Sequence, residues 1–326
     1  MIALSHISAY KFWRAYDGRN FRISPFSNKH QGAIETRNAI LAFAQDHDLV
    51  DQDGKVHITA FAGSPRIKHA GVAAHAATAK LETSLMYINE MIPISNPALT
   101  FLHMATLLEP IPLVALGNEL CSKYALTPNG IKQREAIINT TQLHNYLATA
   151  PKMRAVKKAG IACGNVIDGA RSPMEWKCFM LLTLTHMQGG AKFARPQLNR
   201  SIALQKPIQS IDEWGYPREI ASLECDLVWN SPRIVVVEYQ GKEWHISKVA
   251  MQRDVIKSNL LTSQGILLFE LTSEIVYDEI AFQEFCDMLA KALLHRNRIR
   301  TAHAIERSRE LRRTILPTNW LEIAIP

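Results

Sequence analysis

Residues 225–245 read CDLVWNSPRIVVVEYQGKEWH, two apolar runs separated by asparagine, serine and proline. These three residue types favour turns, so the runs 222–229 and 233–240 are predicted to be the strands of a hairpin. The pattern that follows predicts an amphipathic helix over 244–263 and a further buried strand over 265–271. A hairpin followed by a crossover helix and another strand predicts a mixed α/β sheet with helices on both faces.

The register of this hairpin decides where its polar residues lie. If Asn230 pairs with Ile234, the turn contains three residues and Asp226 lies directly opposite Glu238. Their Cβ atoms would then be about 4.5–5.5 Å apart on one face of the sheet. Gln240 follows Glu238 on that face, because side chains alternate along a strand. A slip by one residue would send the two carboxylates to opposite faces, so a shared site requires an odd-length turn.

Two carboxylates at this spacing repel each other unless one is protonated or a cation bridges them. Asp226 and Glu238 offer oxygen ligands of the kind that suit Mg²⁺ or Mn²⁺. Such an ion could activate water and stabilise the transition state of phosphodiester hydrolysis. The alternative is a pair of solvent-facing acids at a strand end, and the spacing alone leaves both interpretations open.

The hairpin belongs to a longer α/β pattern. Residues 172–187, SPMEWKCFMLLTLTHM, begin with a serine suited to an N-cap, a proline and an early glutamate, and they predict a helix. A strand is expected over 200–206 and a last helix over 277–294. Turn-forming residues at 163–171 separate this region from the preceding chain. We therefore predict a domain over 166–294.

The first 165 residues carry fewer signals of chemistry. Helices are expected over 31–50, 98–108, 112–123 and 130–160, and a strand within 54–63. This pattern predicts a mainly helical α+β N-terminal domain over 1–165, for which a regulatory role is one interpretation.

Positive charge is concentrated near the C-terminus. The net charge of the chain is +7, and residues 295–313, HRNRIRTAHAIERSRELRR, contain seven arginines and two glutamates. We expect residues 295–326 to form a basic C-terminal tail. Such a segment is either a solvated helix face or a surface that contacts phosphates, and composition favours neither.

The composition is that of an ordinary globular protein, with 47% hydrophobic and 21% charged residues. No apolar run reaches about 18 residues, so no transmembrane helix and no membrane partner are expected. We expect no secretory signal in the first residues, which lack a long apolar core. The five cysteines are scattered without a CxxC pair, which predicts neither a zinc ribbon nor a disulfide framework and favours a reducing cytoplasm.

Three ordered motifs within 172–294 resemble the DUF559 domain family, which is similar to the very-short-patch-repair endonucleases of the PD-(D/E)XK superfamily. SPMEWKCFMLL resembles the opening helix of that family, CDLVWNSPRIVVVEYQGKEWH the central hairpin, and RDVIKSNLLTSQGILLFELT the segment after it. The resemblance implies a restriction-endonuclease-like fold, in which a mixed sheet is flanked by helices. It also implies a metal-dependent DNA endonuclease that hydrolyses phosphodiester bonds, with a place in phage defence.

The resemblance implies a role for each matching residue. Asp226 and Glu238 would bind Mg²⁺ or Mn²⁺, and Glu175 would assist from the opening helix. His245 would lie near the scissile phosphate, as a general acid or base or as a group that orients water. The alternative for His245 is a histidine at a helix N-terminus that packs beside Trp244.

The chain departs from the family signature at one position. The signature ends in E-x-K, whereas the third position here is Gln240. Lysine supplies a positive charge to the attacking water or the phosphate, which glutamine lacks. Glutamine can still bind a metal through its carbonyl oxygen or hold a water molecule. The substitution leaves open whether the site cleaves DNA.

Basic and aromatic residues near this site are candidates for contact with DNA. For Trp244 the roles of base stacking and of a core anchor both remain open. The candidates are Lys242, Trp244, Lys257, Arg296, Arg298 and Arg300.

Two short stretches of the first half, SHISAYKFWR (5–14) and ISNPALTFLHMAT (94–106), resemble regulatory regions of the AbiEi antitoxin type. That family is linked to abortive infection and toxin–antitoxin systems, so the resemblance implies a partner toxin protein. It also supplies an alternative function, a non-cleaving DNA-binding transcriptional regulator that retains the nuclease fold. A third interpretation is an interaction module whose second domain binds a partner protein.

Overall fold

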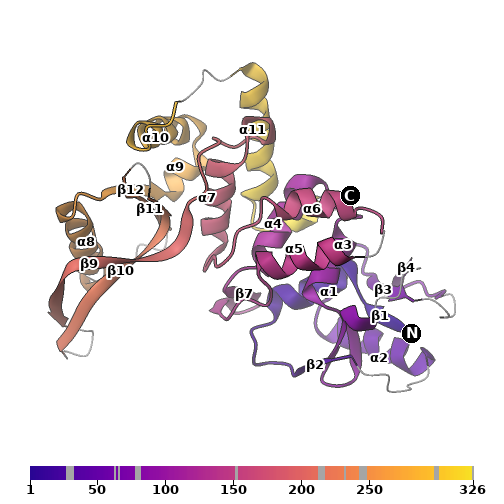
Figure 1. The fold of residues 1–326 in the computed structure, drawn as a ribbon. Helices are drawn as coiled ribbons and strands as arrows, with labels where there is room; N and C mark the ends of the chain where they lie inside the picture. Colours follow the sequence, from indigo (N-terminus) through magenta and orange to yellow (C-terminus); the bar gives the residue numbers. More distant parts are fainter. Residues whose placement is uncertain are drawn as a thin grey trace. The chain divides into compact units, whose positions relative to one another are not determined.

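The chain folds into two compact units in a computed structural model (Figure 1). Unit 1 comprises Met1–Ser172 with Pro317–Pro326, and unit 2 is Pro173–Leu316. The boundaries therefore fall after Ser172 and Leu316, later than the expected divisions after residues 165 and 294. The structure describes residues 1–26, 33–61, 64, 67–77, 82–150, 153–211, 217–230, 233–241, 248–296 and 301–324.

A six-stranded mixed sheet lies at the centre of unit 1, with strand order β2-β5-β6-β1-β3-β4. β1 runs parallel to β6 and antiparallel to β3, and β3 runs parallel to β4. The sheet has more strands than the sequence led us to expect, because β1 and β6 are short and buried on both faces and so show no alternation. The strands are β1 (Ile2–Leu4), β2 (Ile23–Pro25), β3 (Val56–Ala60), β4 (Val72–Ala76), β5 (Leu85–Ile88) and β6 (Ile92–Ser95).

The helices of unit 1 begin at local capping signals. The Asn96 side chain accepts a hydrogen bond from Leu99 N at 2.8 Å, and Pro97 opens the helix. Asn139 and Gln142 form a capping box. The described helices are α1 (His6–Ala15), α2 (Ala33–Asp46), η1 (Glu82–Ser84), α3 (Pro97–Met104), α4 (Pro110–Leu120), α5 (Thr140–Thr149) and α6 (Val156–Cys163). The predictions of helices at α2, α3 and α4 and of a strand at β3 are confirmed.

The prediction that residues 130–160 are helical is confirmed only in part. The first residues of this region form β8 (Gly130–Gln133), which pairs as a hairpin with the preceding strand β7 (Tyr124–Thr127). Gly130, with φ +99°, provides the left-handed conformation that the tight turn requires. The remainder divides into α5 and α6, and Ala155 precedes α6 with a positive φ of 68°. The turn at Gly130 therefore determined the local structure, although the polar pattern of the residues that follow is typical of a helix.

Unit 2 contains a four-stranded sheet of order β12-β11-β10-β9. β10 is antiparallel to both β9 and β11, and β12 is parallel to β11. The elements are α7 (Pro173–Thr183), η2 (His186–Gln188), β9 (Gln197–Ile211), β10 (Pro217–Trp229), β11 (Val235–Gln240), α8 (Lys248–Ser263), β12 (Leu267–Thr272), α9 (Ser273–Tyr277) and α10 (Glu279–Ala292). The predicted order of helix, three strands, helix, strand and helix is confirmed, and the protein is mixed α/β (Figure 1).

Helix α8 is held on this sheet by apolar contacts. Leu261 is fully buried and shares a core cluster with Val228 of β10 and Val236 of β11. Burying a side chain of this size contributes about 1.5–3 kcal/mol to folding. These contacts fix which face of α8 meets the sheet, and therefore which of its polar side chains reach the ends of β10 and β11.

The segment that we expected to be a basic tail is folded. Residues Ala302–Ile315 form helix α11 in unit 2, with Leu311 and Ile315 buried. Trp320–Ala324 form α12 in unit 1, where Trp320 Nε1 donates a hydrogen bond to Glu119 Oε1 at 3.0 Å. An amphipathic pattern underlies α11, whose arginines lie mainly on its polar face.

Gly189 is predicted to be critical for the docking of α11. It ends η2 with φ +90°, and a Cβ atom there would lie 2.3 Å from the carbonyl oxygen of Arg307. We expect Gly189→Ala to lower the free energy of unfolding by about 2–4 kcal/mol, because both the backbone conformation and the contact become unfavourable.

Gly265→Ala is the matched control for this prediction. Gly265 also has a positive φ, of 72°, but a Cβ atom there meets nothing within 4 Å. It should cost only about 1–2 kcal/mol for the left-handed conformation. Urea denaturation followed by tryptophan fluorescence measures both losses, and equal losses would show that the approach of Arg307 is unimportant.

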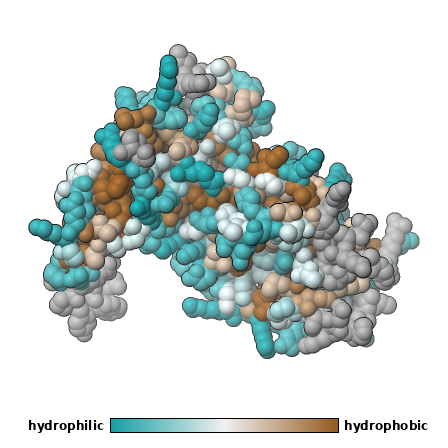
Figure 2. Space-filling model, viewed as in Figure 1, coloured by the Kyte–Doolittle hydropathy of each residue, from teal (hydrophilic) through white to brown (hydrophobic). Residues whose placement is uncertain are grey.

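The surface mixes hydrophilic and hydrophobic residues (Figure 2). Single exposed apolar side chains are normal on folded proteins. Among the residues that the structure describes, no helix has the length and apolar character needed to cross a membrane. The large apolar side chains exposed in unit 2 include Met187, Val255, Ile280 and Leu294.

Candidate active site

The register of the central hairpin places the two predicted carboxylates opposite each other. Leu227 pairs with Val237 and Trp229 with Val235. Continuing this register by one residue places Asp226 opposite Glu238, as the sequence predicted. The middle of the turn, residues 231–232, lies outside the described residues, but the observed register confirms the odd offset.

The side chains of Asp226 and Glu238 connect β10 and β11 at the point where the backbone hydrogen bonding between these two strands ends. Asp226 N donates a hydrogen bond to Glu238 Oε1 at 3.3 Å, and Tyr239 N donates one to Asp226 Oδ2 at 2.9 Å. Each carboxylate thus accepts a backbone N–H from the opposite strand, in place of a carbonyl group. The two side chains are therefore held on adjacent strands at one position of the sheet.

Helix α8 adds a positive charge to this pair. Lys257 Nζ lies 2.7 Å from Glu238 Oε2, and both side chains are largely buried. Lys257 is one helical turn before Leu261, so the packing of Leu261 on the sheet directs Lys257 toward the strand end. Lys257 was predicted to contact the DNA backbone, whereas in the structure its ammonium group forms an ion pair with Glu238.

The charges at this site are incompletely balanced. Burial and the neighbouring Asp226 carboxylate raise the pKa of Glu238 to about 7, although Lys257 acts in the opposite direction. Burial alone would lower the pKa of Lys257, but the Glu238 carboxylate outweighs it and raises that pKa above its ordinary value. Negative charge therefore exceeds what one ammonium group compensates, as expected for two carboxylates near each other.

Helix α7 brings a third carboxylate to the same region. Glu175 is buried in the first turn of α7, and Asn199 Nδ2 donates a hydrogen bond to Glu175 Oε2 at 2.5 Å. One turn later, burial followed by the Asp226 and Glu175 carboxylates raises the pKa of the Cys178 thiol. Asn199 lies between Leu198 and Arg200, which pair with Leu227 and Cys225, so the residue that binds Glu175 lies opposite Asp226 on the neighbouring strand.

Cys225 is not a reactive thiol in this arrangement. Burial and the Glu238 carboxylate raise its pKa to about 12, so the thiol stays protonated at neutral pH. Its side chain belongs to the apolar cluster beneath α8. Catalysis at this site would therefore depend on oxygen and nitrogen groups.

Gln240 lies at the last position of β11, where it pairs in register with Thr272 of β12. Because side chains alternate along a strand, it shares a face with Glu238. Arg296 is exposed after α10. The remaining predicted site residues, Lys242, Trp244, His245, Arg298 and Arg300, lie outside the described residues.

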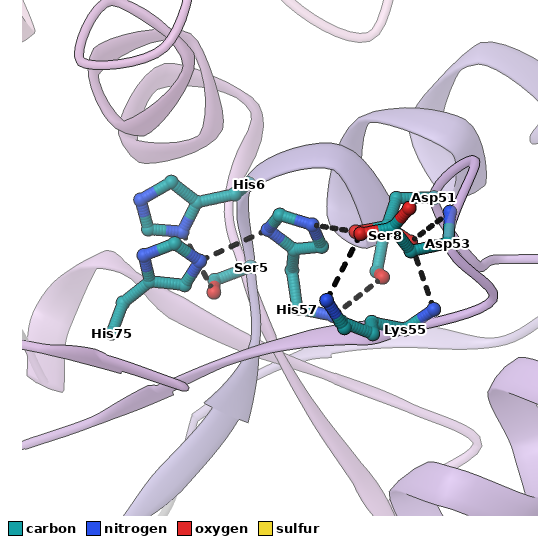
Figure 3. Close-up of polar contacts among 8 residues, drawn as sticks. All are labelled: Ser5, His6, Ser8, Asp51, Asp53, Lys55, His57 and His75. Atoms are coloured by element: carbon teal, nitrogen blue, oxygen red, sulfur yellow. Dashed lines mark hydrogen bonds and ion pairs between the residues drawn. The ribbon is translucent and has the colours of Figure 1, made fainter. Parts of the chain in front are cut away.

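A second polar cluster, which the sequence analysis missed, lies in unit 1. His6, His57 and His75 place ring nitrogens within 4.8 Å of one another (Figure 3). These residues come from α1, β3 and β4, so no short spacing motif joins them. They meet because β3 pairs with β4 beside the start of α1.

Comparison of the chain with known protein families, with curated proteins and with solved structures found no match in any of the three.

Proposed function

We propose that this protein is a metal-dependent DNA endonuclease, and that unit 2 has a restriction-endonuclease-like fold. One observation supports the proposal most strongly. The carboxylates of Asp226 and Glu238 each accept a backbone hydrogen bond from the neighbouring strand, and the Lys257 ammonium group forms an ion pair with Glu238. Glu175 from α7 accepts a hydrogen bond from Asn199, which lies opposite Asp226 on the neighbouring strand β9. Phage defence is the biological setting in which such an activity would fit.

The donor set at the strand ends fits Mg²⁺ or Mn²⁺. Asp226 and Glu238 offer carboxylate oxygens, which hard divalent cations prefer. The raised pKa of Glu238 supports this fit, because it reflects burial and repulsion that a bound cation would relieve. When bound, such an ion supplies Lewis acidity and lowers the pKa of a water molecule.

The proposed roles of the chain's own residues follow from their positions. Asp226 and Glu238 would hold the ion, and the hydrogen bonds that their carboxylates accept from backbone N–H groups of the opposite strand would keep them in place for it. Lys257 would supply the positive charge that the E-x-K signature places two residues after the glutamate. Gln240, on the same face, would orient a water molecule through its amide. Glu175 would assist from α7.

The DNA would be held by basic side chains around this site. Arg296 is exposed and available for phosphate contact. The arginines of α11 fit this role less well, because Arg309 pairs with Glu279 at 3.0 Å and Arg313 with Glu306 at 3.3 Å. Lys242, Trp244, Arg298 and Arg300 remain proposed contacts, and His245 remains a proposed acid or base near the phosphate.

A cleavage assay on the purified full chain tests this proposal. Duplex DNA labelled at one end is incubated with the protein in Mg²⁺, in Mn²⁺ or in EDTA, while fluorescence anisotropy reports binding in parallel. We expect cleavage with either metal ion and none in EDTA. Binding without cleavage under every condition would instead favour the non-cleaving regulator. The absence of both would contradict a role on DNA duplexes.

A further inference from the structure

Three imidazole rings meet beside the sheet of unit 1. His57 Nδ1 and His75 Nε2 are 2.9 Å apart, across the neighbouring parallel strands β3 and β4. The ring of His6 stacks on that of His75, with centroids 3.5 Å apart (Figure 3). His6 and His57 are buried and His75 is partly exposed.

A carboxylate fixes the orientation of His57. Asp51 Oδ2 lies 2.9 Å from His57 Nε2, and Asp51 Oδ1 accepts hydrogen bonds from the backbone N–H groups of Asp53 and Lys55. Burial alone would raise the pKa of Asp51, but the Lys55 N–H and His57 hold that pKa below its ordinary value. The ionised carboxylate keeps a proton on His57 Nε2, so the lone pair of Nδ1 points toward His75.

His6 is held in an unusual backbone conformation. Its φ is 46°, in the left-handed region that residues other than glycine rarely occupy. The ring lies between His75 and His103, whose centroid is 4.5 Å away, and His6 Nδ1 contacts Ser5 Oγ at 3.0 Å. Backbone strain of this kind persists where the surroundings impose it, and it is common at functional sites.

His57 already has the surroundings of a metal-binding histidine, because the Asp51 carboxylate lies 2.9 Å from its second ring nitrogen, Nε2. Neutral imidazole offers a lone pair, and a carboxylate that holds the second ring nitrogen is the usual partner of a metal-binding histidine.

We propose that His6, His57 and His75 form a binding site for a borderline transition-metal ion such as Zn²⁺. Tetrahedral Zn²⁺ has Zn–N bonds of about 2.0–2.1 Å, which place ligand nitrogens about 3.3 Å apart. The ring nitrogens lie within 4.8 Å of one another, and side-chain rotations that separate the stacked His6 and His75 rings would bring them to this geometry. In the metal-free cluster the proton between His57 and His75 belongs to His75 Nε2, and it moves to Nδ1 of that ring when the ion binds.

The proposal fits an imidazole-selecting ion and not Mg²⁺. Three nitrogen ligands suit Zn²⁺, Co²⁺ or Ni²⁺, whereas Mg²⁺ prefers oxygen. With three protein ligands, water would occupy the fourth position, as in zinc sites that keep an open coordination position. Asp51 is a positioning residue, because it acts on the ion through His57.

Metal titration of the full chain tests this site. The protein carries Asp226→Asn, so that the proposed nuclease site contributes little, and it is first dialysed against a chelator. Calorimetry with Zn²⁺ should show one equivalent binding with a Kd on the order of 1 µM or tighter. Co²⁺ should produce the visible absorption bands of a tetrahedral complex, and Zn²⁺ should raise the Tm.

Three variants locate the binding. His75→Gln should weaken Zn²⁺ binding at least tenfold and abolish the Co²⁺ bands, while Asp51→Asn should weaken binding about 10–100-fold. His303→Gln, which removes an exposed histidine of α11, should bind as the parent does. Circular dichroism establishes that each variant is folded, and Asp51→Asn remains informative if His75→Gln fails to fold. Absence of binding at about 100 µM Zn²⁺, or equal binding by a folded His75→Gln protein, would overturn the proposal.

Discussion

Replacement of Asp226 with asparagine is expected to reduce metal-dependent DNA cleavage by at least about a hundredfold, the loss typical for removal of a principal electrostatic group. Asparagine keeps an oxygen that can accept the hydrogen bond from Tyr239 N, now 2.9 Å from Asp226 Oδ2. It removes the charge that would hold a divalent cation beside Glu238. Single-turnover cleavage of the labelled duplex measures the loss.

Asp287→Asn provides the matched control for this experiment. Asp287 is an exposed carboxylate on α10 of the same unit, and it accepts a hydrogen bond from Gln283 at 2.9 Å. The same change of charge at this exposed position on another helix should leave the cleavage rate unaltered. Cleavage by Asp226→Asn at the wild-type rate, with normal circular dichroism, would remove Asp226 from the mechanism.

Replacement of Lys257 with methionine is expected to lower the cleavage rate on the order of a hundredfold. Methionine keeps most of the apolar stem beside Leu261 and removes the ammonium group that lies 2.7 Å from Glu238 Oε2. If Lys257 supplies the positive charge of the missing E-x-K lysine, binding of DNA should weaken far less than the rate. A large loss of DNA affinity with an unchanged rate would instead make Lys257 a backbone contact, as the sequence alone suggested.

A second substitution tests whether the site requires a positive charge at the position of Lys257 or accepts one at the position of Gln240. Gln240 shares a face with Glu238, so Gln240→Lys would return a lysine to the position that the signature specifies. In the Lys257→Met background this change should restore a measurable part of the rate. If the double variant is as slow as Lys257→Met, a charge at position 240 cannot substitute for the charge of Lys257.

Lys257→Arg keeps the positive charge but alters its geometry, and we expect an intermediate cleavage rate.

The hairpin of unit 2 was predictable because local signals agreed with one another. The valine run, the turn residues and the two acids permit one register that places Asp226 beside Glu238, and the observed pairing has that register. A helix at α8 and a strand at β12 were also predicted, although the apolar residues of α8 are spread around the helix and do not form the amphipathic pattern that we expected.

The position of Lys257 could not be predicted in the same way. Its ammonium group reaches Glu238 because Leu261 anchors α8 on the sheet, and that packing is a tertiary effect. The histidine cluster was hidden for the same reason, because His6, His57 and His75 meet only when β3 and β4 pair beside α1. In the region 130–160, a glycine turn with positive φ interrupted a pattern that looked helical.

The central claim is that Asp226 and Glu238 form a metal-dependent centre that hydrolyses DNA. The most direct test is a time course of supercoiled plasmid with equal amounts of wild-type and Asp226→Asn protein, in Mg²⁺ and in EDTA. We predict conversion to nicked and linear DNA by the wild-type protein in Mg²⁺ alone, and almost none by the variant. Conversion by both proteins at equal rates, or intact plasmid with the wild-type protein in both Mg²⁺ and Mn²⁺, would contradict the claim.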